Sequence, residues 1–181
     1  MLSDLRKSFN RRNLTDPSFS FLFDEDTSGE VVVLAVGATS FEQAQAELLE
    51  LTAIVIRGSR LLTSEKFHMK TGGEAGAVDE AVLALLRFAG SRPLAGYYLK
   101  FAIGLIDRIV RPLIGVQIPN DRIEVSSLYY DQRRVQPGRN PADLRFDSIL
   151  RDLELPDRGS SGSFDDAVSA GLIYLTLRQT T

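Results

Sequence analysis

Apolar residues follow one another without interruption from Val31 to Val36, and turn-forming residues stand on both sides of the run. A short β-branched run bounded in this way is typical of a strand buried on both faces, which we place at Val31–Leu34. Two more strands are predicted, from Glu47 to Ile56 and from Leu61 to Met69, because Arg57–Arg60 is a typical tight turn. The three strands would form an antiparallel meander. Residues 42–50 could instead open as a short helix, and propensity alone leaves this open.

After residue 70 the pattern alternates between helical and strand periodicity. The predicted elements are, in order, a helix from Val78 to Ala89 that ends at Gly90, a strand from Leu94 to Tyr98, a helix from Phe101 to Leu113 that stops near Pro112, a strand from Arg122 to Leu128, a helix from Leu144 to Leu153 and a closing helix from Phe164 to Arg178. The small residue Gly171 in the last helix would permit close approach to the sheet. Three strands followed by alternating helices and strands predict an α/β fold, a mixed five-stranded sheet flanked by helices.

Residues 1–30 read as an arm that precedes the main domain at 31–181. Leu2, Leu5, Phe9 and Leu14 suggest one face of a short basic helix that Asp16 and Pro17 end. Phe19, Phe21 and Phe23 then alternate with other residues, as in an extended segment with one aromatic face. We favour packing of these rings on the main domain. The alternative is that the arm docks a protein partner or an anionic surface.

The amino-acid composition limits the classes of function that are open to the chain. The chain has 181 residues, 44% hydrophobic and 25% charged, which fits a globular domain with a full core. It has no cysteine and one histidine, His68, which we expect at the surface and not as a ligand. The net charge of −3 argues mildly against an extensive grip on nucleic-acid phosphates.

The same features bear on location. The longest apolar stretch, Leu94 to Val116, is interrupted by charged residues and by Pro112, so no membrane span is predicted. The first residues lack the apolar region of a secretion signal. We therefore expect a cytoplasmic protein.

Four strings, in order along the chain, resemble motifs of the DnaQ-like 3'-5' exonuclease family, whose fold is RNase H-like. They are Val31 to Thr39, Glu47 to Ile56, Leu94 to Ala102 and Asp166 to Leu175. Arg122 to Tyr130 also resembles the polymerase III epsilon-like subgroup of that family. The resemblance spans residues 30–178 and implies a dimer as one oligomeric state, although no pattern locates an interface.

The family's chemistry requires four carboxylates that hold two Mg²⁺ or Mn²⁺ ions, and a histidine as general base. The resemblance places the first two carboxylates at Ala35 and Gly37, the third at Ala102 and the fourth at Asp166, and the histidine at Ser161. Of these positions, only Asp166 carries an acidic side chain. A carboxylate there would equally suit the dipole at the N-terminus of the last helix, and we favour this structural interpretation. We therefore expect no bound metal or other cofactor unless residual activity survives.

Two further groups of residues are candidates for contact with a nucleotide or nucleic acid. Tyr97 and Tyr98 replace the His-Asn pair of the second motif and are expected to be core and rim aromatics, one of which could stack on a base. Arg133 and Arg134, with Arg139 and Arg145, follow the last predicted strand and could meet phosphate, but a solvated loop is the favoured interpretation.

The sequence thus predicts a catalytically degenerate exonuclease-like domain that acts as a binding or regulatory module for a protein partner, with residues 1–30 as one candidate for its docking segment. The alternatives are residual metal-dependent 3'-5' exonuclease or nucleotide phosphodiesterase activity, and a nucleotide or nucleic-acid binder that does not hydrolyse its ligand.

Overall fold

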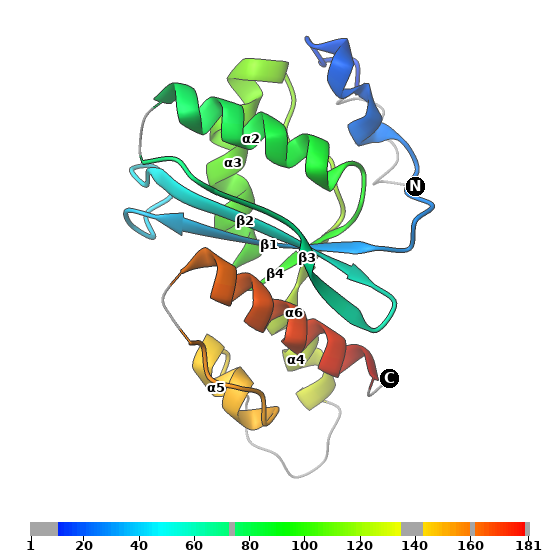
Figure 1. Ribbon diagram of the computed structural model, residues 1–181, viewed down its shortest axis with the longest axis vertical. Coiled ribbons are helices and arrows are strands. Elements are labelled where there is room, and N and C mark those ends of the chain that lie inside the picture. Colours follow the sequence, from blue (N-terminus) through cyan, green and yellow to red (C-terminus); the bar gives the residue numbers. More distant parts are fainter. Residues whose placement is uncertain (1–10, 73–74, 135–142, 160–161, 180–181) are drawn as a thin grey trace.

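A computed structural model describes residues 11–72, 75–134, 143–159 and 162–179, which form one sheet with helices on both faces (Figure 1). The elements are, in order, the 3-10 helix η1 (Pro17–Phe23), β1 (Val31–Ala38), β2 (Leu48–Arg57), β3 (Arg60–Lys70), α2 (Ala75–Ala89), β4 (Leu94–Gly96), α3 (Leu99–Ile114), β5 (Arg122–Glu124), α4 (Val125–Arg134), α5 (Phe146–Asp152) and α6 (Ser163–Gln179). The strand order is β3-β2-β1-β4-β5. The pairs β3·β2 and β2·β1 are antiparallel, whereas β1·β4 and β4·β5 are parallel, as the sequence predicted.

The alternation of side chains along β1 divides the core into two layers. Val32 and Leu34 belong to the cluster under α2 and α3, and Val31, Val33 and Ala35 belong to the cluster under α4, α5 and α6. Figure 1 shows these two groups of helices on opposite faces of the sheet. Because β1 is covered on both sides, its continuous apolar run is explained by burial alone.

Close contacts in two places depend on glycine. A Cβ atom at Gly96 would lie 2.6 Å from the carbonyl oxygen of Leu34, so glycine is what lets β4 approach β1. On α6, a Cβ atom at Gly171 would lie 2.7 Å from Cδ1 of Leu61, which confirms the predicted close approach of this helix to the sheet.

The arm differs from the prediction. Residues 17–23 form a 3-10 helix instead of an extended segment, since Asp16 caps it by accepting a hydrogen bond from the backbone N–H of Ser18 at 2.9 Å. Phe19 and Leu22 are buried in the core, and Phe21 and Phe23 are half-buried against it. The aromatic side chains of the arm therefore pack on the domain. Residues 1–10, with most of the predicted basic helix, lie outside the described residues.

The prediction of a strand up to Leu128 was also wrong. The strand stops at Glu124, and α4 begins at Val125. The Glu124 carboxylate accepts hydrogen bonds from the N–H and hydroxyl of Ser126, at 3.3 and 2.9 Å, which fixes the start of the helix. α3 runs past Pro112 and ends at Gly115, whose φ is +80°. Residues 42–46 form a turn before β2, and not a helix of the length considered.

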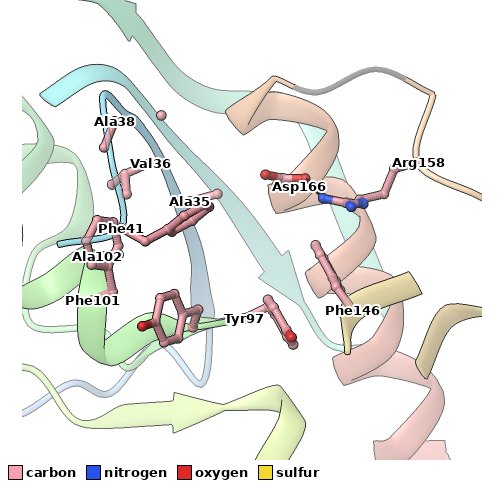
Figure 2. A pocket seen from close by; sticks show the side chains of 12 residues that line it. Ala35, Val36, Ala38, Phe41, Tyr97, Phe101, Ala102, Phe146, Arg158 and Asp166 are labelled. Carbon is pink, nitrogen blue, oxygen red and sulfur yellow. Dashed lines mark hydrogen bonds and ion pairs between the residues drawn. The ribbon is translucent and has the colours of Figure 1, made fainter. Parts of the chain in front are cut away.

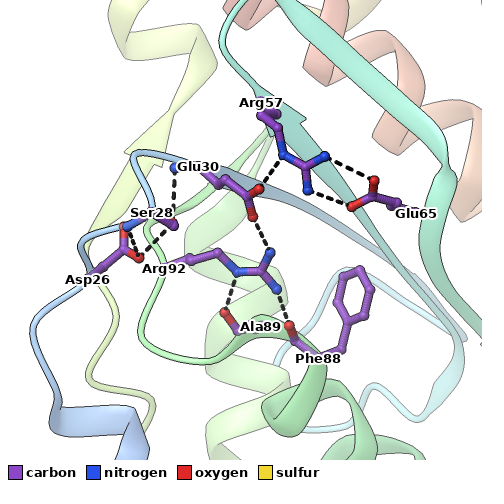
Figure 3. Close-up of polar contacts among 8 residues, drawn as sticks. All are labelled: Asp26, Ser28, Glu30, Arg57, Glu65, Phe88, Ala89 and Arg92. Carbon is purple, nitrogen blue, oxygen red and sulfur yellow. Dashed lines mark hydrogen bonds and ion pairs between the residues drawn. The ribbon is translucent and has the colours of Figure 1, made fainter.

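An ion-pair network holds the start of β1, at Glu30 (Figure 3). The Glu30 carboxylate, 13% exposed, accepts hydrogen bonds from Arg57 at 2.6 Å and from Arg92 at 2.7 Å. These two bonds lower the pKa of Glu30. The network joins β1, the β2–β3 hairpin and the end of α2.

Among the described helices, none is both long enough and apolar enough to cross a membrane.

Candidate functional site

A pocket of about 360 Å³ opens where β1 ends, between α3 and α6 (Figure 2). This position, beyond the carboxyl ends of parallel strands, is where α/β folds commonly place ligands. Its lining residues are Ala35, Val36, Gly37, Ala38, Phe41, Tyr97, Tyr98, Phe101, Ala102, Phe146, Arg158 and Asp166. The structure therefore brings together six residues that the sequence singled out: Ala35, Gly37, Ala102, Asp166, Tyr97 and Tyr98.

Small neutral residues stand in the pocket where the family would place three carboxylates. Ala35 is 8% exposed and Ala102 is 3% exposed. A Cβ atom at Gly37 would lie 3.0 Å from Cβ and 3.3 Å from Oε2 of Glu50 on the neighbouring strand β2. The side chain of Glu50 thus occupies the space beside Gly37.

The carboxylate of Glu50 is engaged in a polar network. It accepts a hydrogen bond from the backbone N–H of Ser163 at 3.1 Å and lies 3.4 Å from Nε2 of His68. His68 Nδ1 is 2.8 Å from the hydroxyl of Thr52, which in turn is 2.7 Å from the buried hydroxyl of Ser163. His68 is at the surface, as expected, and its ring links β2, β3 and α6.

The remaining acid, Asp166, is paired with a guanidinium. Arg158 Nη1 donates to Asp166 Oδ1 at 2.9 Å, and Arg158 Nε donates to Asp147 Oδ1 at 2.8 Å. The same guanidinium lies over the Phe146 ring, 4.9 Å from its centroid. Figure 2 shows Arg158 and Asp166 facing each other beside Phe146. A positive charge therefore already neutralises Asp166, the one acid at the positions that the resemblance assigned.

The other walls are aromatic. Tyr97 stacks on Phe146 with centroids 4.3 Å apart and planes 4° apart, and its hydroxyl donates to the Leu144 carbonyl at 2.9 Å. Burial raises the pKa of Tyr97. Opposite, Tyr98 stacks on Phe101 at 5.5 Å, and Phe41 is tilted against both rings at 6.2 and 5.9 Å. Tyr97 is half-buried and Tyr98 is exposed, in agreement with the predicted core and rim positions.

The predicted arginine cluster is not part of this pocket, and the interpretation as a solvated loop was wrong for two of its members. Arg133 and Arg134 lie in the last turn of α4. Arg133 is 11% exposed, pairs with Asp152 and covers the Tyr129 ring. Arg145 is an exposed partner of Asp143. Arg139 and Ser161 lie outside the described residues.

The residues present do not fit the two-metal centre of the resemblance. In the part of the chain that the structure describes, no three histidine or acidic side chains are grouped so that they could hold a metal ion. Hard divalent cations need several oxygen ligands, whereas this pocket offers one carboxylate, already bound by Arg158.

Sequence reasoning missed Phe41, Glu50 and Arg158. Phe41 carried a weak signal, as a lone aromatic residue in a polar loop. Glu50 was concealed within an apolar strand, and Arg158 lies between two predicted helices, where no pattern singles it out. Their roles depend on which elements pack together.

Comparison with known proteins gives the fold. No protein-family model matches the sequence, and no curated protein matches it. Among solved structures, Escherichia coli exonuclease I with a dT13 oligonucleotide is similar, with a TM-score of 0.68 and 8% identity over 84% of this chain and 41% of that one. The zinc-bound complex of E. coli exonuclease I with ssDNA gives a TM-score of 0.69 and 10% identity over 86% and 41%.

The complex of exonuclease I with SSB-Ct gives a TM-score of 0.67 and 10% identity over 84% and 42%. The chain thus spans about two fifths of the length of the exonuclease I chains that it matches. The mixed sheet flanked by helices and these similarities together show that this protein has an RNase H-like fold that exonuclease I also has.

Proposed function

We propose that this chain is a catalytically degenerate exonuclease-like domain that binds a protein partner and does not hydrolyse nucleic acid. One observation carries the proposal. The positions that the resemblance gives to the active site meet in one pocket, which is lined by Ala35, Gly37 and Ala102, and its one carboxylate, Asp166, is ion-paired with Arg158. The domain keeps the fold while the groups that perform the reaction are replaced.

Electrostatics support this interpretation. Metal-dependent cleavage of a phosphodiester needs cations that activate water and stabilise the leaving oxygen, and several carboxylates must balance their charge. In this pocket Arg158 takes the position of a cation beside Asp166, but a guanidinium cannot generate a hydroxide nucleophile. Loss of a general base alone lowers rates by about 10²–10⁴-fold, and loss of the metal ligands removes the mechanism.

The nature of the partner is part of the proposal. Structures of exonuclease I include complexes with ssDNA and with SSB-Ct, which supports a nucleic-acid or a protein partner for a chain with this fold. In the described part of the arm, Phe19 is buried and Phe21 and Phe23 are half-buried against the core, which favours the exposed rings at the pocket rim as the docking surface. Assignment to the epsilon-like subgroup and a cytoplasmic location remain predictions.

The alternative is residual exonuclease activity from a rearranged site, because Glu50 lies beside the Gly37 position. Hydrogen bonding of this carboxylate to Ser163 and its contact with His68 disfavour a role as a free metal ligand.

The test is incubation of the purified protein with end-labelled single-stranded DNA and short RNA in Mn²⁺, beside an Asp166→Ala variant prepared in parallel. We expect both proteins to leave the labelled ends intact. Metal-dependent 3' trimming by the wild type that the variant lacks would refute the proposal. Calorimetric titration with Mn²⁺ is the second measurement, and saturable binding that Asp166→Ala abolishes would favour the alternative.

A further inference from the structure

Two aromatic rings at the mouth of the pocket are unusually exposed. The Phe41 residue is 80% exposed and Tyr98 is 51% exposed, and both rings contact Phe101. The Phe41 ring makes angles of 57° and 54° with the nearly parallel Tyr98 and Phe101 rings, so the three form a corner. Exposed apolar groups gathered in this way mark interaction sites.

The loop that carries Phe41 is fastened to α3. Arg108 donates hydrogen bonds to the carbonyl oxygens of Gln43, at 2.5 Å, and of Ala46. The Gln43 side chain lies against Gly104, where a Cβ atom would overlap it. Since the loop is fixed at both the backbone and a side chain, Phe41 is held in place without being covered.

A different set of contacts fixes the backbone of Tyr98. It has φ +56° and ψ +36°, a left-handed conformation that a tyrosine adopts at an energetic cost. The Glu124 carboxylate holds it there by accepting hydrogen bonds from the backbone N–H groups of Tyr98 at 3.1 Å and Leu99 at 2.7 Å. Two separate sets of contacts thus position the two exposed rings, which lowers the entropy lost when a partner binds.

The charges around the corner select the partner. The carboxylates that line the pocket or contact its lining residues are those of Glu50, Glu124, Asp147 and Asp166. Against them stand three cations. Arg158 pairs with Asp147 and Asp166, Arg108 is bound to the loop that carries Phe41, and Lys100 is exposed on the first turn of α3. Four carboxylates thus face three cations, so the surroundings are slightly acidic and suit a cation better than a phosphate.

Inside the pocket, one cation already contacts an aromatic ring. Arg158 lies over the Phe146 ring and against Asp166, which is an aromatic-plus-carboxylate arrangement for a guanidinium. Among the described residues, the cations found over aromatic rings lie over rings other than Phe41, Tyr98 and Phe101. In the outer corner the Phe41 and Tyr98 rings are exposed to such a cation, whereas Phe101, 6% exposed, supports them from below.

We propose that Phe41, Tyr98 and Phe101 form a docking corner for an arginine or lysine side chain on a basic segment of a protein partner. The inference rests on the proposed function as a protein-binding module, and it specifies the chemistry of the partner. The cation would stack on the exposed rings while the surrounding carboxylates attract the rest of the basic segment.

The probes are fluorescein-labelled peptides of equal length, built on a Gly-Ser backbone with arginine, glutamine or glutamate at the same positions, and a labelled oligo-dT. Fluorescence anisotropy is measured with the full chain at low salt and without divalent ions. We expect the arginine peptide to bind more tightly than the glutamine peptide. Phe41→Ala and Tyr98→Gly should each weaken its binding by about twofold to fivefold, the range of a cation–π contact at an exposed site.

Tyr130→Ala is the matched control, because Tyr130 is 43% exposed on α4 and is not among the pocket-lining residues. It should leave the arginine peptide's affinity unchanged. Equal affinities for the arginine and glutamine peptides, no binding of either, or binding unaffected by both corner variants would overturn the proposal. So would oligo-dT binding that requires Phe41 while the arginine peptide does not bind.

The peptide-binding assay contains no metal ion. A negative result in it would therefore refute the docking corner without bearing on nuclease activity, which the trimming assay measures. Trimming in that assay would refute degeneracy whether or not the peptides bind.

Discussion

Replacing Arg158 tests whether its guanidinium takes the place of a cation beside Asp166. Both side chains are 30% exposed and their N–O distance is 2.9 Å. Partly exposed ion pairs contribute about 1 kcal/mol or less, and the stack on Phe146 adds about 0.5–1 kcal/mol. Arg158→Gln also removes the hydrogen bond to Asp147, so in total it should lower the free energy of unfolding by about 1–3 kcal/mol.

A double-mutant cycle isolates the interaction energy between Arg158 and Asp166. We expect Arg158→Gln and Asp166→Asn to destabilise by less in combination than the sum of their separate effects, with a coupling energy of about 1 kcal/mol. Urea unfolding followed by circular dichroism is the measurement. In a protein of this size, about 1 kcal/mol also corresponds to about 2–4 °C in the melting temperature.

The control cycle uses Arg145 and Asp143, whose side chains are 83% and 44% exposed although they are 2.5 Å apart. Solvent screening should leave this pair with no measurable coupling. If the effects of Arg158→Gln and Asp166→Asn simply add, Arg158 does not neutralise Asp166 and the electrostatic account of the pocket is wrong.

Four further substitutions, in three comparisons, test the fold by urea unfolding. Gly96→Ala should destabilise by about 2–4 kcal/mol, since its Cβ atom would lie 2.6 Å from the Leu34 carbonyl oxygen, and wild-type stability would contradict that close approach. Tyr98→Ala should be less stable than Tyr98→Gly by about 1 kcal/mol, because only glycine adopts φ +56° without strain, and equal stabilities would argue against the left-handed conformation. Glu30→Gln should cost about 1–2 kcal/mol at pH 7. Because the folded-state pKa of Glu30 is lowered, this difference should persist above about pH 4.3 and shrink as the pH falls through the lowered pKa. A difference that grows on acidification would refute the assignment.

Much of the fold could be predicted because it depends on local pattern. The run from Val31, the turn at Arg57–Arg60 and the helical spacing from Val78 to Ala89 appear in the structure at nearly the predicted bounds. Patterns failed where a distant or polar contact decided the backbone. Asp16 caps a 3-10 helix where alternation suggested an extended segment, and Glu124 starts α4 where apolar residues suggested a strand.

For the site, the sequence by itself determined what is missing. Ala35, Gly37 and Ala102 carry no ligand for a metal, whatever their surroundings, because side-chain chemistry is fixed by residue type. The tertiary structure decided what fills the space. Glu50 lies beside Gly37 because the two residues are partners in the β1–β2 pairing, and Arg158, which precedes α6, donates a hydrogen bond to Asp166 on that helix. Such contacts join residues far apart in the chain or on separate elements, so no local periodicity could show them, and they require the packed sheet and helices to exist.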